Sequence, residues 1–474
     1  MDRLLIEATI PVVPILTVRS LMNSLPQIPL ARLRDVVRGR VVLPGDAEFD
    51  RARRPWNLAI EQSPSAVVEA VDADDVAAVL RFASTHAVPV TAQPSGHGAT
   101  GRADGAILLR TGHLDAISVD PDARTARIGA GVRSGELQRA AAAHSLTALP
   151  GSSPVVTVAG AALGGGLSWF SRRFGWMADG LLAADIVLAD GTSRRVDDSD
   201  PELLWALRGG GGELAIVTSL EVRLRPAPTL FGGRLLWPTA HSRAVAEAYR
   251  AMTRTAPDEL TLWLELLHFP GAEPMIAIDS TYLGSEEDAR EAMRPVENLP
   301  APLSDTRAMI SAADIGGITG EPTAPGAGLS RGELLSHLDD TALDALLNEP
   351  IAPLMTVQIR HLEGALAQPT DSPHGPLREP YAVYLFGVPA SAEIAASIRA
   401  TQERLTAALP VTGRKPITFL APGEKLADAL PAESLRRLRG LKEALDPRGI
   451  IRGNFALSDA DSTSSKSFDT HMME

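Results

Sequence analysis

A histidine inside a run of small residues is the first place where this sequence could do chemistry. Residues 93–101 read Gln-Pro-Ser-Gly-His-Gly-Ala-Thr-Gly and follow the apolar run 87–92. Such a loop has few bulky side chains, so a phosphate could approach its backbone N–H groups. Glycine also permits backbone conformations that are closed to other residues. The alternative is a tight surface turn with an incidental His97, which a short glycine motif taken alone favours.

Further small-residue motifs follow in order along the chain and weigh against that alternative. Residues 149–169 contain a glycine triplet at 164–166, and residues 200–212 end in a run of four glycines. Ile216 opens a β-like run, and residues 441–455 near the C-terminus contain Asp-Pro-Arg-Gly and Arg-Gly-Asn-Phe. Several linked motifs are far more specific than one.

In order and spacing, these motifs resemble those of berberine bridge enzyme-like oxidoreductases of the bacterial type. That family belongs to the flavoproteins with the vanillyl-alcohol oxidase and p-cresol methylhydroxylase (PCMH) fold. The resemblance runs from about Val41 to Leu224 and returns near Leu441. It implies an α+β fold, with a PCMH-type FAD-binding domain and a substrate domain whose antiparallel sheet is covered by helices.

The resemblance also implies which residues hold FAD. His97 is the position that bonds covalently to the flavin in the family, and the other expected contacts are Gln93, Pro94, Ser95, Gly96, Gly98, Gly101, Ser153, Val156, Gly160, Gly164, Gly165, Gly166, Ile216, Val217 and Asn454. Asn454 equally suits a turn asparagine.

This chain departs from the family at several of these positions. Pro94 removes one N–H donor from the first loop. Ser153 stands where many members have a second flavin-linking cysteine, so attachment through His97 alone is expected. Ala161 replaces a histidine beside the ring, and the small Val156 stands where a valine is associated with oxidases.

The catalytic acid or base is harder to assign, because the family's Tyr-x-Asn-Tyr motif is not recognisable. The strand-like run 355–365 offers Gln358 and Arg360 on one face and His361 and Glu363 on the other. One pair is expected to face the cleft, where a histidine or carboxylate could remove a proton. An ion pair or a packing role is the alternative. Tyr384 is a weaker candidate.

Composition excludes several classes of function. The net charge of −13 disfavours nucleic acid and anionic membranes as partners. The chain has no cysteine, which rules out disulfides, thiolate catalysis and cysteine-ligated metals, and no metal site is expected. The apolar run near Met1 is too short to span a bilayer and lacks the basic start of a signal peptide, so a cytoplasmic location is expected.

The pattern along the chain predicts five segments. These are an N-terminal arm of unknown role (1–40), the FAD-binding domain (41–227), the substrate domain (228–440), a return to the FAD-binding domain (441–457) and a disordered tail (458–474). Within them, helical spacing predicts a helix over 74–86, the Asp190-Gly191 pair predicts a hairpin turn, and 316–331 and 368–380 read as loops.

The function implied by the resemblance is that of an FAD-dependent oxidase. A small-molecule substrate (an alcohol, sugar or secondary-metabolite intermediate) would give a hydride to flavin N5, and molecular oxygen would reoxidise the flavin to form hydrogen peroxide. A flavin-dependent dehydrogenase or oxygenase is one alternative. A non-catalytic flavin- or ligand-binding protein is another, because Ser153, Ala161 and the missing tyrosine motif depart from the family. The sequence leaves the oligomeric state open.

Overall fold

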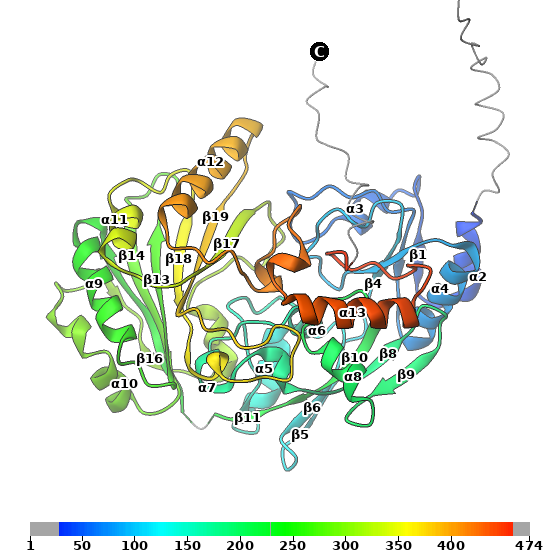
Figure 1. Ribbon diagram of the computed structural model, residues 1–474, viewed down its shortest axis with the longest axis horizontal. Coiled ribbons are helices and arrows are strands. Elements are labelled where there is room, and N and C mark those ends of the chain that lie inside the picture. Colours follow the sequence, from blue (N-terminus) through cyan, green and yellow to red (C-terminus); the bar gives the residue numbers. More distant parts are fainter. Residues whose placement is uncertain (1–27, 228, 458–474) are drawn as a thin grey trace, which may run out of the picture.

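The structure is a computed structural model that describes residues 28–227 and 229–457. The predictions for the tail and for most of the N-terminal arm therefore lie outside the described residues. Figure 1 shows two parts side by side: an N-terminal region with the C-terminal helix α13 against it, and a large antiparallel sheet with helices on its outer side.

The N-terminal region begins with a four-stranded sheet. Its strand order is β1 (Arg40–Val42), β2 (Ala66–Glu69), β4 (Ile107–Arg110) and β3 (Val90–Ala92). Helix α4 (Ala73–His86) covers it, and the helix begins where the Asp72 carboxylate accepts a hydrogen bond from the Asp75 N–H at 3.0 Å. The β3 strand ends directly before the 93–101 loop, so the sheet fixes where that loop starts.

A second, antiparallel sheet carries the middle motifs. Its order is β5 (Ile117–Asp120), β6 (Thr125–Gly129), β10 (Ile216–Arg223), β8 (Leu181–Val187) and β9 (Ser193–Val196). The predicted Asp190-Gly191 turn is confirmed, since it joins β8 to β9 and Gly191 has a φ of +83°. The remaining strands and helices of this region are β7 (Leu146–Thr147), β11 (Arg225–Pro226), α2 (Leu33–Val36), α3 (Phe49–Arg53), α5 (Ser134–Ala142), α6 (Val158–Leu163), α7 (Ser171–Phe174) and α8 (Pro201–Leu207).

The C-terminal segment returns to the N-terminal region along helix α13 (Ala432–Leu445). The Val90 N–H donates to the Ile450 carbonyl at 2.7 Å, which places residues 450–452 alongside β3. Glu213 holds the segment in place, because its carboxylate accepts from the Gly453 N–H at 3.2 Å and the Leu457 N–H at 3.0 Å. The hydrophobic core of the N-terminal region already includes Ile417, so this packing starts before the predicted return at residue 441.

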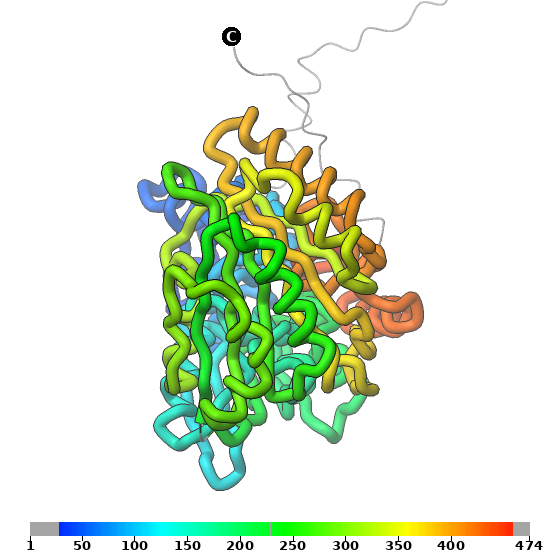
Figure 2. Tube along the Cα trace, turned by 90° about the vertical axis from the view of Figure 1, so that its left-hand side faces the viewer, coloured from blue at the N-terminus to red at the C-terminus, as the bar shows by residue number. Residues whose placement is uncertain are grey.

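The large sheet has the order β15 (Ser304–Asp305), β12 (Phe231–Pro238), β14 (Met275–Tyr282), β13 (Leu260–Leu267), β18 (Thr356–His361), β19 (Tyr381–Gly387) and β17 (Leu329–Leu335), with β16 (Ala308–Met309) also on β12. Its outer face carries α9 (Ser242–Thr253), α10 (Glu286–Ala292), α11 (Asp340–Leu347) and α12 (Ala392–Ala408). Figure 2 shows α9, α11 and α12 lying over one face of the strands.

Short 3₁₀ helices complete the described elements: η1 (Leu30–Arg32), η2 (Met177–Gly180), η3 (Thr239–His241), η4 (Arg294–Asn298), η5 (Ala312–Gly317), η6 (Gly364–Ala367), η7 (Ile417–Phe419) and η8 (Leu426–Asp428). The predicted α+β class, with an antiparallel sheet covered by helices, is confirmed. The exact boundary near residue 228 stays a prediction, since that residue is outside the described part of the chain.

Candidate functional site

The His97 side chain carries an unsatisfied nitrogen. Its Nδ1 lies 2.7 Å from the Ser95 hydroxyl, and its ring stacks on Trp56 with ring centroids 4.3 Å apart. Nε2 is buried and has no hydrogen-bond partner. Such an atom is uncommon in a folded protein and calls for a bound group to explain it.

Electrostatics keep this imidazole neutral. Burial lowers the pKa of His97 to about 4, and the positive charge of Arg133 contributes to that decrease. When Nδ1–H donates to Ser95, the lone pair stays on Nε2. A neutral ring with a free lone pair is a nucleophile, and this is the property that covalent attachment requires.

The neighbouring loop residues hold His97 in place. Gly96 has a φ of +82°, and a Cβ there would meet Pro55 Cβ at 2.8 Å, so only glycine fits. Gly101 also has a positive φ, of +86°. The Gln93 side-chain amide exchanges two 3.1 Å hydrogen bonds with Gln62 inside the protein. The Pro94 backbone nitrogen carries no hydrogen and cannot donate to a phosphate.

Asn454 comes together with this loop, although more than 350 residues separate them in the chain. The Thr100 hydroxyl donates to the Asn454 carbonyl at 2.7 Å, across a separation of 354 residues. The Asn454 Nδ2 lies 3.2 Å from the position of a Cβ on Gly98. The structure therefore brings the first and last of the predicted cofactor motifs to one place.

The second motif packs against the start of α5. The Val156 carbonyl accepts from the Ser134 N–H at 2.8 Å, and Ser153 and Val156 are both partly buried. Gly160 lies on the exposed side of α6, while Ile216 and Val217 begin the buried strand β10. The latter two side chains belong to hydrophobic cores, so only their backbones could reach a ligand.

The space beside the glycine triplet is occupied by His374, a histidine that the sequence motifs did not indicate. A Cβ on Gly165 would lie 2.5 Å from His374 Nε2, and a Cβ on Gly209 would lie 2.8 Å from its Cδ2. His374 comes from the predicted loop 368–380 and stacks on Trp176 with centroids 4.6 Å apart. The space beside Gly165 is thus occupied by this imidazole, and the only sequence signal was a histidine in a proline-rich loop.

Burial dominates the chemistry of His374. It lowers the pKa of the imidazole to about 3, with a further contribution from the charge of Arg414. Nε2 has no hydrogen bond of ordinary geometry, although backbone groups of Gly164 and Gly209 are close enough to favour the charged form slightly. The neutral ring packs between two segments of the chain.

The packing of the large sheet against its helices determines which predicted catalytic pair faces the N-terminal region. Val357 and Ile359 pack in the core beneath the helices, so Gln358 and Arg360 lie on the opposite face of β18. Tyr384 of β19 is paired directly with Gln358 and therefore shares that face. Trp263 on β13 is directly opposite Arg360 and stacks on Trp169 of the N-terminal region, with centroids 3.9 Å apart.

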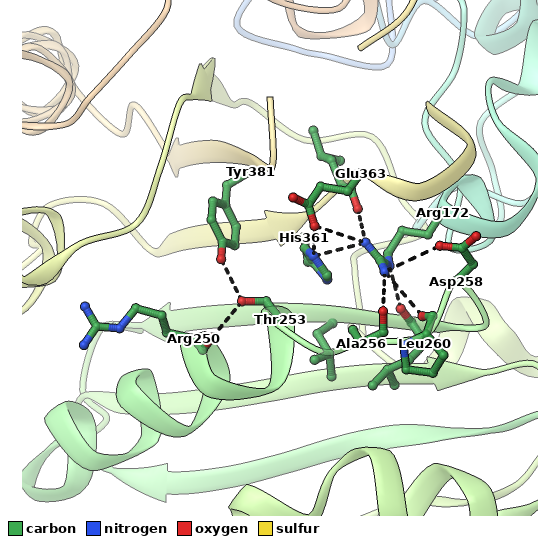
Figure 3. A network of polar contacts seen from close by, with 12 residues as sticks. Arg172, Arg250, Thr253, Ala256, Asp258, Leu260, His361, Glu363 and Tyr381 are labelled. Atoms are coloured by element: carbon green, nitrogen blue, oxygen red, sulfur yellow. Dashed lines mark hydrogen bonds and ion pairs between the residues drawn. The ribbon is translucent and has the colours of Figure 1, made fainter. Parts of the chain in front are cut away.

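His361 shares the face of Val357 and Ile359, and Figure 3 shows it with Glu363 beside Arg172. His361 Nε2 lies 3.0 Å from both Glu363 Oε2 and Arg172 Nη1, and Arg172 also donates to the carbonyls of Leu362 and Leu260. Burial lowers the pKa of His361, and the bond to His361 lowers the pKa of Glu363. This network ties α7 to the C-terminal end of β18, an arrangement that suits the ion-pair role expected as the alternative for this pair.

A buried carboxylate on the inward face was missed from the sequence. Glu265 lies in the same register as Gln358, and its Oε2 accepts from Arg234 at 2.7 Å, while Oε1 has no partner. Burial, followed by the nearby Asp279, raises the pKa of Glu265. A single carboxylate within the apolar run 260–267 was the available signal.

The inward face and the cofactor motifs meet across the molecule. Besides the Trp169–Trp263 stack, Thr418 Cγ2 lies 3.0 Å from the Cβ position of Gly164. The Asn57 side chain donates to the Gly328 carbonyl at 3.0 Å, next to Trp56, which stacks on His97. The Trp169–Trp263 and Asn57–Gly328 contacts therefore join the large sheet to the N-terminal region.

Comparison with known proteins agrees with this geometry. A family model described as an FAD binding domain matches residues 64–197, which contain His97 and the glycine triplet. This stretch is an FAD-binding domain. The fold expected from the resemblance to berberine bridge enzyme-like flavoproteins is confirmed.

Relatives by sequence include named oxidoreductases. The (R)-6-hydroxynicotine oxidase of Paenarthrobacter nicotinovorans is 30% identical over 60% of this chain and 64% of its own length. The FAD-linked oxidoreductase dpmaF of Metarhizium anisopliae is 29% identical over 53% of this chain and 50% of its own. The chain thus matches between half and two thirds of the length of these curated relatives.

Solved structures extend the match to almost the whole chain. The 6-hydroxy-D-nicotine oxidase from Arthrobacter nicotinovorans superposes with a TM-score of 0.77 at 24% identity, over 89% of this chain and 98% of that one. BBE-like 1 of Physcomitrella patens gives a TM-score of 0.79 at 20% identity, over 90% and 99%. At these identities the likeness establishes the fold.

The residues of the FAD-binding domain fit their cofactor. His97 Nε2 is buried without a partner, in a loop whose glycines leave room for a close approach. The chain has no cysteine, so a thioether bond to the flavin is excluded. In the part of the chain that the structure describes, no helix is long and apolar enough to cross a membrane.

His374 predicts an acid-sensitive stability. Its folded pKa of about 3 lies below the ordinary value of 6.5, so the unfolded chain takes up the proton first. The stabilisation is complete above pH 6.5 and is lost as the pH falls from there towards 3. Lowering the pH from 7 to 5 should reduce the free energy of unfolding of the unaltered protein by about 2 kcal/mol more than that of His374→Gln.

Urea unfolding at pH 7, 6 and 5 measures this difference. His144→Gln, at an exposed histidine, is the matched control and should follow the unaltered protein. Parallel pH dependences for His374→Gln and the unaltered protein would show that this imidazole titrates normally.

Proposed function

We propose that this protein is an FAD-dependent oxidoreductase, and more specifically an oxidase that acts on a small-molecule substrate and passes electrons to molecular oxygen, releasing hydrogen peroxide. The observation that carries the proposal is the unpartnered, buried Nε2 of His97 within a matched FAD-binding domain. FAD supplies a hydride acceptor at flavin N5 and a route for two electrons to an acceptor. His97 would hold it through a single covalent bond.

The inward face of the large sheet is the proposed substrate side. Gln358, Arg360, Tyr384 and Glu265 present an amide, a guanidinium, a phenol and a carboxylate towards the N-terminal region. Such convergent polar groups orient a small molecule and exclude others. An alcohol, a sugar or a secondary-metabolite intermediate remains the proposed substrate class. Several structures of the same fold are of oxidases, among them a chitooligosaccharide oxidase.

Glu265 is the proposed proton acceptor. Oxidation of an alcohol or amine removes a proton along with the hydride, and a positioned base lowers the barrier to that transfer. Glu265 Oε1 accepts no hydrogen bond, although the carboxyl interacts with that of Asp279, and its raised pKa brings it closer to the working pH than an ordinary glutamate. The pKa of Tyr384 is raised by burial, which disfavours the phenolate that would act as a base.

Val156 supports the choice of oxygen as the electron acceptor. In the family that this chain resembles, a small residue at this position is associated with oxidases. A variant of Phl p 4 in which one isoleucine is replaced by valine has the same fold and is described as a glucose oxidase. The partly buried Val156 would leave space for oxygen where a larger side chain would fill it.

His97→Ala tests covalent attachment. After acid precipitation, the unaltered protein should give a yellow pellet and a colourless supernatant, because the flavin stays bonded to the denatured chain. His97→Ala should give a colourless pellet, and His144→Ala, at an exposed histidine, should remain yellow. The measurement is the visible spectrum of both fractions. A yellow supernatant from the unaltered protein would leave FAD bound but unattached, and no flavin in either fraction would contradict the function.

Val156→Ile tests the use of oxygen without a known substrate. The holoprotein is reduced with dithionite and mixed with oxygenated buffer, and flavin absorbance is followed by stopped flow. The flavin of the unaltered protein should be reoxidised rapidly. In Val156→Ile the reoxidation rate should be at least roughly tenfold lower, because the larger side chain narrows the path of oxygen to the flavin. Val155→Ile is the neighbouring control. Slow reoxidation of the unaltered protein would favour a dehydrogenase.

Glu265→Gln tests the proton acceptor once peroxide release has identified a substrate. The unprotonated carboxylate is the active form of a base, so kcat/KM should rise with pH through the raised pKa of Glu265. Glu265→Gln should lower it by about 100-fold and flatten that rise. Glu221→Gln, at a partly exposed carboxylate, is the control. An unchanged pH profile in Glu265→Gln would exclude this role.

A further inference from the structure

The inward face of the large sheet holds a cation without an acidic partner. The Arg360 side chain donates from Nε and Nη2 to the Gln358 Oε1, at 3.1 and 2.6 Å. Among the described residues, no carboxylate oxygen lies within 4.0 Å of its guanidinium. A guanidinium has five N–H donors, so those on Nη1 are left for another acceptor.

Three aromatic rings surround this guanidinium. Its central carbon lies 4.0 Å from the centroid of the Trp263 ring, 5.4 Å from that of Tyr384 and 5.6 Å from that of Phe419. Trp263, Phe419 and Gln358 are buried, whereas Arg360 and Tyr384 are partly exposed. The cation therefore lies against ring faces while part of the Arg360 side chain stays exposed.

The nearest carboxylates are paired with another arginine. Arg234 donates to Glu265 at 2.7 Å and to both oxygens of Asp279 at 2.6 Å, and burial raises the pKa of both carboxyls. The charges of Glu321 and Glu265 favour the protonated form of Arg360, but neither carboxylate forms an ion pair with it among the described residues. Arginine does not lose its proton in proteins, so Arg360 keeps its charge although burial disfavours it.

We propose that Arg360 binds a carboxylate of the substrate. This inference rests on the proposed function, because it assigns a substrate class to the same site. A carboxylate can accept two parallel N–H bonds from one guanidinium, which satisfies the charge and the free donors together. The rings of Trp263, Tyr384 and Phe419 border the cation and would exclude water from the pair. The substrate class is a small carboxylic acid.

Titration of the flavin-loaded full-length protein with benzoate tests this assignment. Benzamide has the same shape without the charge and serves as the neutral probe. Binding is followed by calorimetry and by the change in flavin absorbance. Benzoate should bind at least tenfold more tightly than benzamide, which corresponds to about 1.4 kcal/mol.

Variants then assign the preference to Arg360. Arg360→Gln should weaken benzoate binding by at least tenfold and leave benzamide unchanged, and Arg360→Lys should lie between. Arg399→Gln, at an exposed arginine on α12, is the matched control and should bind both probes as the unaltered protein does. Circular dichroism and a thermal melt identify any variant that fails to fold, and Arg360→Lys then decides the outcome.

Three results would overturn the assignment. Equal binding of benzoate and benzamide would show no anion preference. Equal loss of both probes in a folded Arg360→Gln would give this side chain a structural role. A loss of bound flavin in that variant, with no benzoate binding in the unaltered protein, would make the cation a cofactor contact. Absence of flavin from the unaltered protein counts against the proposed function instead, and calorimetry on that sample still reports on the anion site.

Discussion

The close approach of the large sheet to the FAD-binding domain is the constraint on which the site depends. Trp263 stacks on Trp169, and His374 fills the space that Gly165 and Gly209 leave by lacking a Cβ. A side chain at either glycine would collide with the imidazole at less than 3 Å. Because these contacts are tightly packed, small changes there would separate the inward sheet face from the cofactor loops.

Buried polar groups fix the position of the C-terminal segment and supply the reactive atoms near the FAD-binding motifs. The Glu213 carboxylate accepts hydrogen bonds from two N–H groups of the C-terminal segment, and this places Asn454 beside the loop of His97. Most buried polar atoms have partners, so the exceptions at His97 Nε2 and Glu265 Oε1 are informative. The proposed reaction gives these two atoms the roles of nucleophile and base. His361 Nδ1 is unpartnered as well, but the His361 Nε2 and Glu363 contacts with Arg172 tie α7 to β18.

Much of the fold could be predicted from local patterns. The helix over 74–86 and the turn at Asp190-Gly191 follow from capping residues and glycine, whose preferences act over a few positions. The 93–101 loop was recognisable because small residues and one histidine stand together. His374 and Glu265 were not recognisable, since the importance of His374 comes from neighbours far away in the chain and that of Glu265 from residues on other strands.

The sequence by itself determined that this chain carries an FAD-binding motif set and that Gln358 and Arg360 share a face opposite His361. Strand alternation has period two, so it divides side chains between two faces without saying what each face meets. Only the tertiary structure decided that. The apolar Val357 and Ile359 are drawn beneath the helices, where their burial is most favourable, and this turns Arg360 towards the FAD-binding domain.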